Sequence, residues 1–171
     1  MTRKGTKNEA PPGVKPTSVH YDDESALVAA LKGQQFLAIT LGVMAPPDLH
    51  SKIVHAAAKA GVPRIFPNLF YLDETNESLL KENHLGGDYK SMLADIEAVG
   101  CSWTMMVCSL WYEYSLAMGP VWFGFDFANK KLKLYDDGKT KVNLTTWEQC
   151  GRALAAFLSL KELPKTRTTK A

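Results

Sequence analysis

The sequence predicts an α/β fold, in which a doubly wound parallel sheet is covered by helices on both faces. Apolar runs typical of buried strands alternate with amphipathic helical segments along the chain. The strand runs are apolar throughout, as expected for strands buried on both faces. The length of 171 residues and the hydrophobic fraction of 46% suit one domain with a sizeable core.

The first half of the chain contains three strand candidates and two helix candidates. Strands are expected at residues 18–21, 35–40 and 62–66, and helices at residues 24–32 and 46–60. Asp22 and Asp23 offer N-caps for the first helix, and Pro46 and Pro47 open the second. Glycines follow both helices, as is typical of helix C-termini.

The second half continues the alternation and then changes character. Residues 67–87 are loop-like, with at most a helical turn near 77–82, and a helix is expected at 88–99, a strand at 102–109 and a helix at 145–160. The turn Asp136-Asp137-Gly138 predicts a hairpin between 131–135 and 141–144. A capping box beginning at Thr145 opens the last helix. The inward face of that helix is predicted to contain Trp147, Cys150, Leu154, Phe157 and Leu158.

Charge is distributed unevenly along the chain. Residues 1–16 and 161–171 are each basic and lack periodicity, so both are expected to be disordered tails. Between them lies an acidic body, which is a poor match for nucleic acid, so no nucleic-acid partner is expected. No apolar run is long enough for a membrane span and no secretory signal is present, so we expect a soluble, cytoplasmic protein.

Motifs with metal or phosphate chemistry are not found in the sequence. The three cysteines and four histidines lack metal-ligand spacing, so no metal site is expected. There is no G-x-G-x-x-G or Walker loop, and the pair Gly86-Gly87 does not follow a strand. An aromatic cluster comprises Trp111, Tyr112, Tyr114, Trp122, Phe123 and Phe125. This cluster either lines a substrate pocket beyond the strand at 102–109 or packs a loop onto the sheet.

Several segments together resemble a known family. Residues 22–34 read DDESALVAALKGQ and residues 55–68 read HAAAKAGVPRIFPN. These resemble a helix and a helix–strand passage of the NmrA-like and isoflavone-reductase-like proteins, atypical relatives of the short-chain dehydrogenases. Segments similar to a fungal branch of that family lie at 103–108, 111–116, 122–126, 136–140 and 147–153. The resemblance covers residues 18–164.

The resemblance implies a partial NAD(P)-binding, Rossmann-like domain over residues 17–160, with NADP or NAD as the cofactor. By position, Thr40, Leu41 and Gly42 would pass along the cofactor, and Pro67, Asn68, Cys108 and Ser109 would lie near the nicotinamide. Family reductases carry a lysine at the start of the helix that contains residues 95–100. The matching slot holds Tyr89, and the neighbouring Lys90 is the candidate catalytic residue.

The resemblance also implies that the first two strands and the Gly-rich turn of the family are missing, and that the C-terminal part is shortened. The missing turn would weaken or abolish cofactor binding. We expect residues 18–21 either to pair directly with 35–40 or to remain unpaired. The exposed sheet edge at 35–40 would favour a homodimer.

Three functions follow from this resemblance. The first is an NAD(P)H-dependent oxidoreductase acting on a small organic substrate. The second is a regulatory protein that senses nucleotide or redox state, binds a protein partner and performs no catalysis. The third is a degenerate fragment with little cofactor binding.

Overall fold

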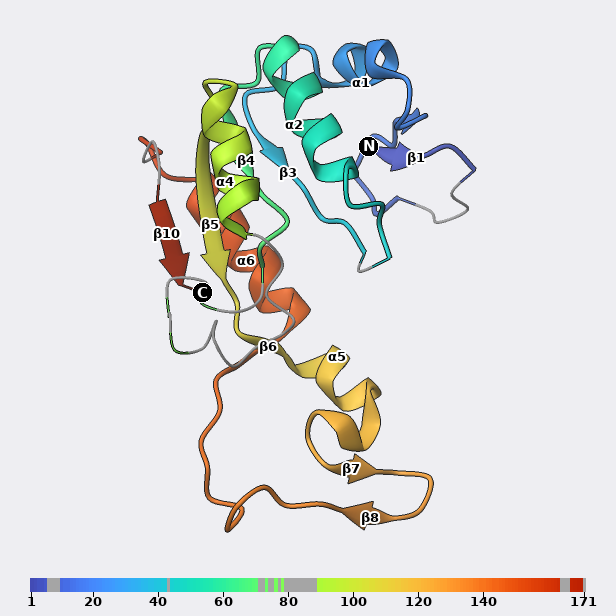
Figure 1. The fold of residues 1–171 in the computed structure, drawn as a ribbon, viewed down its shortest axis with the longest axis vertical. Helices are drawn as coiled ribbons and strands as arrows, with labels where there is room; N and C mark the ends of the chain where they lie inside the picture. The colour runs from blue at the N-terminus through green and yellow to red at the C-terminus, as the bar shows by residue number, and fades with distance from the viewer. Residues whose placement is uncertain are drawn as a thin grey trace. The chain divides into compact units, whose positions relative to one another are not determined.

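The computed structural model describes residues 1–5, 10–42, 44–70, 73, 76, 78, 89–163 and 167–170. The chain divides into two compact units (Figure 1). Unit 1 consists of Met1–Asn68, Gly87–Met105 and Lys165–Arg167, and unit 2 of Leu69–Gly86, Met106–Pro164 and Thr168–Ala171. Apart from residue 78, the helical turn expected near 77–82 lies outside the described residues, as does the pair Gly86-Gly87.

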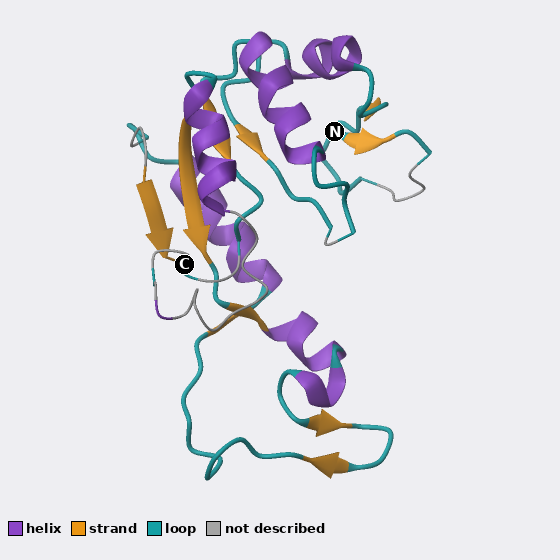
Figure 2. Cartoon of the chain, in the orientation of Figure 1, coloured by secondary structure: helices purple, strands orange, loops and turns teal. Residues whose placement is uncertain are grey.

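Helices and strands alternate in unit 1, which confirms the α/β prediction (Figure 2). In chain order its elements are β1 (Thr2–Arg3), β2 (Ser18–Val19), α1 (Glu24–Leu31), β3 (Leu37–Ala38), α2 (Leu49–Lys59), β4 (Arg64–Phe66), α4 (Tyr89–Ala98) and β5 (Ser102–Val107), whose last two residues belong to unit 2. The strands are shorter than the apolar runs that predicted them, most clearly β3. The helices match their predicted ranges within a few residues.

A four-stranded sheet has the order β10-β5-β4-β3, where β10 is Arg167–Lys170. Strand β3 pairs parallel with β4, with Leu37 opposite Ile65, and β4 pairs parallel with β5, with Ile65 opposite Trp103. The helices α2 and α4 make the crossover connections that parallel neighbours require. The carboxyl ends of β3 and β4 therefore lie at the same edge of the sheet.

The core of unit 1 lies between its helices and this sheet. Helix α1 packs on α2, and α2 packs on α4. The buried core residues are Val19, Leu27, Leu31, Ile39, Leu49, Ile53, Val54, Ala56, Ala57, Val62, Ile65, Ile96 and Cys101. Small residues such as Ala56 and Ala57 allow α2 to approach its neighbours closely, and both are completely buried.

Local signals place α1 as the sequence predicts. The Asp23 carboxylate accepts hydrogen bonds from the Ala26 backbone N–H at 3.0 Å and from the Ser25 hydroxyl at 2.7 Å. These bonds lower the pKa of Asp23 because they stabilise its charged form. Gly33 follows the helix with φ of +79°, a conformation that favours glycine.

The pairing expected for residues 18–21 is wrong. Strand β2 pairs parallel with β1, with Thr2 opposite Ser18 and Arg3 opposite Val19. The Thr2 N–H donates to the Thr17 carbonyl at 2.8 Å, and the Lys4 N–H donates to the Val19 carbonyl at 2.9 Å. Part of the segment 1–16 thus forms a β-strand. Strands of two residues are held by backbone hydrogen bonds, and so short a segment has no readable periodicity.

Strand β10 lies in the other segment for which disorder was expected. It occupies the edge of the four-stranded sheet beside β5. Its residues, RTTK, include two threonines, which favour extended backbone, and the edge position tolerates charged residues. Composition alone therefore did not reveal this strand.

Unit 2 consists of several short elements and one longer helix. In chain order these are β6 (Leu110–Trp111), α5 (Tyr112–Ala117), the 3₁₀ turn Gly119–Val121, β7 (Phe125–Asp126), β8 (Lys131–Leu132), β9 (Leu144–Thr145) and α6 (Trp147–Leu158). Strand β6 pairs parallel with β9, and β7 pairs antiparallel with β8.

The predicted hairpin is displaced. Strand β8 pairs with the preceding β7, so the hairpin turn lies at residues 127–130 rather than at Asp136-Asp137-Gly138. Asp126 stabilises the observed turn because its carboxylate accepts from both the backbone and the side chain of Asn129. Gly124 also favours this pairing, since a Cβ there would lie 1.9 Å from the Lys133 carbonyl oxygen. The other turn exists, but the segment after it pairs with β6.

The last helix forms over nearly the predicted range, with its N-cap one residue after Thr145 and only part of its predicted inward face buried. Thr146 is the N-cap, and its hydroxyl accepts from the Gln149 N–H at 3.1 Å. Phe157 is buried, whereas Trp147 and Leu158 are 56% and 41% exposed. The periodicity identified the apolar stripe correctly, but within its unit the stripe is only partly covered.

Candidate functional site

The carboxyl ends of β3 and β4 are joined by one side chain. The Leu41 backbone N–H donates to the Asn68 side-chain oxygen at 2.9 Å, and the Asn68 side-chain N–H₂ donates to the Leu41 carbonyl at 3.2 Å. The Asn68 amide thus satisfies both backbone groups of Leu41, as a neighbouring strand would. This double hydrogen bond fixes the turn that follows β3.

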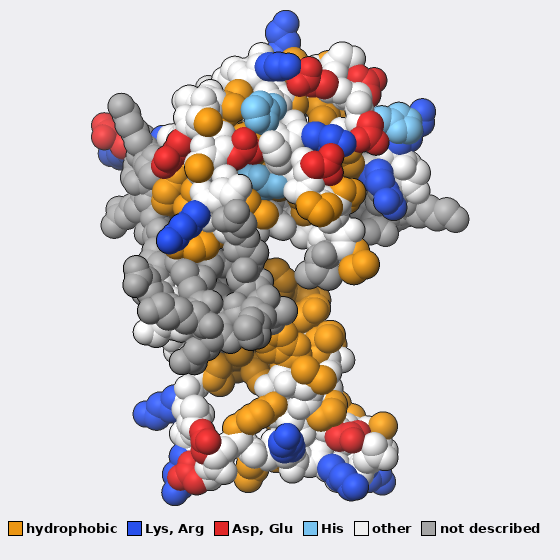
Figure 3. Space-filling model, in the orientation of Figure 1, with side chains coloured by type: hydrophobic (Ala, Val, Ile, Leu, Met, Phe, Trp, Pro, Cys, Tyr) orange, Lys and Arg blue, Asp and Glu red, His pale blue; other side chains and the backbone are white. Residues whose placement is uncertain are grey.

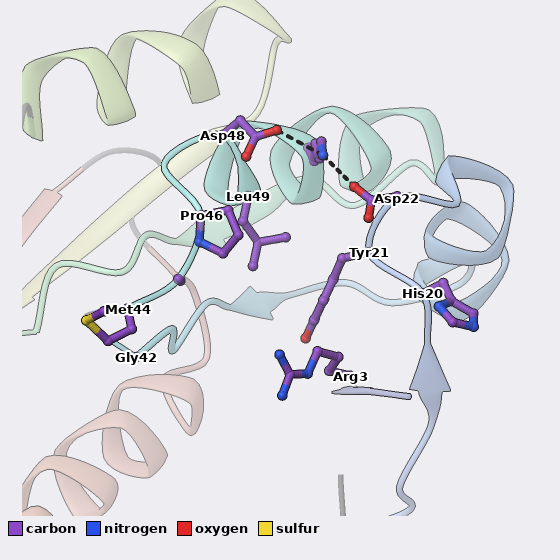
Figure 4. Close-up of a pocket in the computed structure, with 11 residues that line it drawn as sticks. Arg3, His20, Tyr21, Asp22, Gly42, Met44, Pro46, Asp48 and Leu49 are labelled. Carbon is purple, nitrogen blue, oxygen red and sulfur yellow. Dashed lines mark hydrogen bonds and ion pairs between the residues drawn. The ribbon is translucent and has the colours of Figure 1, made fainter. Parts of the chain in front are cut away.

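A pocket of about 550 Å³ lies in unit 1 beside this turn (Figure 4). Its volume falls in the range of small-molecule sites. It is lined by Arg3, His20, Tyr21, Asp22, Gly42, Met44, Ala45, Pro46, Asp48, Leu49 and Lys52. These residues come from β1, from the segment after β2, from the turn after β3, and from the start of α2. In α/β sheets, ligands bind beyond the carboxyl ends of strands, which is the location of this pocket.

An ion-pair bridge connects two of the segments that line the pocket. The Lys52 ammonium lies 2.6 Å from the Asp22 carboxylate and 2.9 Å from the Asp48 carboxylate. Both contacts raise the pKa of Lys52 well above its usual range, and the bond to Lys52 lowers the pKa of Asp48. The bridge ties the residues after β2 to the first turn of α2, and its one ammonium and two carboxylates leave a net charge of −1.

A cationic and an aromatic side chain face the pocket from another direction. Tyr21 is half-buried, and burial raises the pKa of its phenol, while the charge of Arg3 lowers it to a smaller extent. In Figure 4 the Arg3 guanidinium and the Tyr21 hydroxyl point toward one another. The pair offers a planar aromatic face beside a permanent positive charge, a combination suited to a base and a phosphate.

Five residues that the resemblance assigns to the cofactor are brought together in unit 1. Gly42 lines the pocket, and Leu41 is bonded to Asn68. Thr40 is exposed next to Leu41, and Pro67 is completely buried next to Asn68. The cofactor-binding role of these residues remains a prediction.

The remaining assigned residues lie elsewhere. Cys108 is completely buried, and the Ser109 hydroxyl donates to the Asn143 carbonyl at 3.0 Å, both within unit 2. Lys90 is exposed in the first turn of α4 in unit 1, with its ammonium 6.0 Å from the centre of the Tyr89 ring. It does not line the described pocket.

The aromatic cluster of unit 2 packs against itself. The Trp111 and Tyr114 rings meet edge to face at 6.3 Å, and Tyr114 and Trp122 do so at 6.4 Å. The Trp111 indole N–H donates to the Phe70 carbonyl at 3.0 Å. These contacts favour the packing interpretation, although Tyr112 and Phe125 are exposed.

Arg3 and Tyr21 were not among the predicted site residues. Arg3 lies in a segment assigned to disorder, and two residues of extended backbone leave no periodic signal. The usable signal was the run from Ser18 to Asp22, since the residues after a strand in an α/β fold face the ligand edge.

Among the described residues, no group of histidine, cysteine and acidic side chains could hold a metal ion. His50 is buried, and its Nε2 has no hydrogen-bond partner in the described part of the chain. No helix within the described ranges is long and apolar enough to cross a membrane.

The solved structures similar to this chain include several reductases and a nucleoside-diphosphate-sugar epimerase. Isoflavone reductase superposes with a TM-score of 0.62 at 18% identity, over 99% of this chain and 68% of that chain. Triphenylmethane reductase from Citrobacter sp., complexed with NADP(H), gives 0.61 at 19% identity, over 91% and 53%. AtPrR2 with NADP⁺ and (+)-pinoresinol gives 0.61 at 19%, over 90% and 52%.

This chain therefore spans about half the length of most of these structures and shares the Rossmann-like α/β fold of reductases of the isoflavone reductase type. Neither the family models nor the curated proteins yield a match to the sequence.

Proposed function

We propose that this chain is an NmrA-like NAD(P)-binding protein and forms part of an NAD(P)H-dependent oxidoreductase acting on a small organic substrate. The observation that carries the proposal is the pocket at the carboxyl ends of β2 and β3, lined by Arg3, Tyr21 and Gly42. The shared fold with two reductases solved with NADP supports the same ligand.

The pocket suits the adenosine end of the cofactor. Tyr21 presents an aromatic face for the adenine ring, and Arg3 provides the charge that a ribose phosphate requires. Lys52 contributes less, because its charge is compensated by Asp22 and Asp48. An arginine at this position favours NADP over NAD, since only NADP carries a phosphate on that ribose.

By the resemblance, Leu41 would pass along the cofactor, and Asn68, Cys108 and Ser109 are the residues assigned to its nicotinamide end. A bound cofactor supplies a hydride to the substrate. Lys90 is the proposed catalytic residue, which would stabilise or protonate the oxygen that becomes negative when the substrate is reduced.

Cofactor binding is tested by thermal unfolding with and without excess NADPH. We expect cooperative unfolding with a melting temperature that rises with NADPH. A ligand at about 100 times its Kd stabilises a protein by about 2.7 kcal/mol. Arg3→Gln should reduce the rise for NADPH more than for NADH. Lys4→Gln is the matched control, since Lys4 follows Arg3 directly and does not line the pocket. If NADPH does not change the melting temperature of the unchanged chain, the proposal is contradicted.

Catalysis is tested separately, by NADPH oxidation with a panel of carbonyl and enone compounds. Lys90→Ala should abolish turnover while leaving the NADPH-induced melt shift intact. Lys130→Ala, which removes another exposed lysine, should leave turnover unchanged. Full turnover by Lys90→Ala would remove Lys90 from the catalytic role.

A second candidate is a regulatory protein that binds the nucleotide without catalysis. It is favoured by the position of Lys90 outside the pocket lining. This function predicts an NADPH-dependent melt shift without turnover, and capture of a protein partner that depends on the NADP/NADPH ratio. A degenerate fragment would show neither a shift nor turnover.

We also propose a homodimer formed through the edge of the sheet. Strand β3 is the terminal strand of the order β10-β5-β4-β3, so its outer backbone groups can pair with another strand. Sedimentation at increasing concentration tests this, and a monomer throughout would contradict it.

A further inference from the structure

Unit 2 brings two cysteines into contact from distant parts of the sequence. Cys108 follows β5, and Cys150 lies in the first turn of α6. The two thiols lie close enough to influence one another, and both are free. The Cys108 thiol donates to the Met106 carbonyl at 3.9 Å. The third cysteine, Cys101, lies in unit 1, where its thiol donates to the Val62 carbonyl at 3.2 Å.

Three further contacts hold the two cysteine-bearing segments together. Strands β6 and β9 pair so that Leu110 lies opposite Leu144. The Ser109 hydroxyl donates to the Asn143 carbonyl at 3.0 Å. The Trp147 N–H, at the start of α6, donates to the two oxygens of the Glu113 carboxylate at 3.2 and 3.1 Å. The proximity of the thiols is therefore built into the local fold.

The two thiols differ in their access to solvent. Cys108 is completely buried, and burial together with the neighbouring Cys150 raises the pKa of Cys108 to about 12. Cys150 is only half-buried. An oxidant from solvent therefore reaches Cys150 first, while Cys108 remains a protonated thiol at neutral pH.

We propose that Cys108 and Cys150 form a reversible intramolecular disulfide that links the end of β5 to the first turn of α6 when the chain meets a hydroperoxide. The Cys150 sulfur attacks the peroxide, so an S–O bond forms, the O–O bond breaks and an alcohol or water leaves. The Cys108 sulfur then attacks the sulfenic acid, an S–S bond forms, and the oxygen departs as water with the remaining proton. The thiols are oxidised and the peroxide is reduced. A dithiol restores both thiols. The site requires no nicotinamide cofactor, so it stands independently of the proposed function.

The test uses the full chain, reduced and then treated with a small excess of hydrogen peroxide. We expect the number of titratable thiols under denaturing conditions to fall from three to one, the intact mass to fall by two hydrogens, and dithiothreitol to reverse both changes. Proteolytic fragments should show Cys108 joined to Cys150, and the yield should not depend on protein concentration.

Matched variants separate this disulfide from general oxidation. Cys101→Ser should form the cross-link normally, and Cys150→Ser should not form it. Cys108→Ala should leave Cys150 to accumulate as sulfenic or higher oxides. If Cys108→Ala does not fold, the proteolytic fragments of the oxidised, unchanged chain still show whether Cys108 is joined to Cys150. Oxygen adducts on Cys150 without the Cys108 link, or a Cys150–Cys150 bond between two chains, would overturn the proposal.

Discussion

The two units differ in how far their large apolar side chains are buried. In unit 1, Val54, Ile65 and Phe66 are completely buried, whereas in unit 2 Phe127 and Leu134 are 68% and 61% exposed. Among the described residues, thirteen of the sixteen exposed large hydrophobics belong to unit 2. Figure 3 shows apolar side chains at the surface over α5 and the β7–β8 hairpin.

This difference indicates where stability arises. Unit 1 buries its apolar stripes within a continuous core, and burial contributes free energy roughly in proportion to the apolar area removed from water. Unit 2 relies more on ring contacts, short ladders and a helix cap. Substitutions should therefore have unequal effects in the two units.

The largest effect is expected at the centre of the core of unit 1. Ile65→Ala should destabilise the chain by about 2–5 kcal/mol, because Ile65 is completely buried in β4 and its loss leaves a cavity. Leu134→Ala, in unit 2, should change stability by less than about 0.5 kcal/mol. Urea unfolding followed by circular dichroism measures both. If both substitutions lower the free energy of unfolding by similar amounts, the two units do not differ in their contribution to stability.

A smaller loss is expected from the bond between the strand ends. Asn68→Leu should cost about 1–3 kcal/mol, since the half-buried N–H and C=O of Leu41 both lose their partner. Asn68→Asp retains an acceptor for the Leu41 N–H and should therefore recover part of that loss. The midpoints of urea unfolding should fall from the unchanged chain to Asn68→Asp and then to Asn68→Leu. An aspartate variant that is weaker than the leucine variant would contradict this account.

The cap of α6 should contribute less. Thr146→Ala removes the hydroxyl that accepts from the Gln149 N–H and should cost about 1 kcal/mol. Thr146→Ser keeps the cap and is the control. If unit 2 unfolds separately, only the transition with the lower midpoint should move. Hydrogen exchange of α6 amides would resolve that transition.

The smallest effect at neutral pH concerns His50. Burial lowers its pKa, while the nearby Asp95 carboxylate on α4 partly opposes the shift. The unfolded chain binds a proton on His50 more readily than the folded chain does, with the usual pKa of 6.5. Above that pH His50 is neutral in both states, and the folded chain keeps its full stability. Stability should fall as the pH drops below 6.5 toward the lowered folded pKa. His50→Gln should flatten this dependence in urea titrations between pH 7.5 and 5. An equal slope in the variant would assign the effect to other groups.

The sequence predicted the elements that have local signals. Asp23 with Gly33 delimits α1, and Thr146 begins α6, because caps and helix-ending glycines act within a few residues. Pairing between distant residues was predicted less well. The turn at Asp136-Asp137-Gly138 forms, yet β8 pairs with β7, and that choice depends on Gly124 lying against Lys133.

The candidate site shows the same contrast between local signals, which the sequence reveals, and contacts between distant residues, which it does not. The resemblance indicated Leu41 and Asn68, but nothing in the sequence indicated that their backbone and side chain bond to one another. Arg3 escaped prediction because its strand consists of two residues within a basic, proline-containing segment. Contacts that close a pocket join segments far apart in sequence, and periodicity carries no information about them.

The double hydrogen bond at Asn68 has a consequence for the thermodynamics of binding. It holds the backbone of Leu41 in one conformation before any ligand arrives, although Leu41 lies outside β3. The entropy of ordering that turn is therefore lost during folding rather than during association. A molecule that enters the neighbouring pocket meets a wall that is already preorganised, and it retains more of its contact energy as affinity.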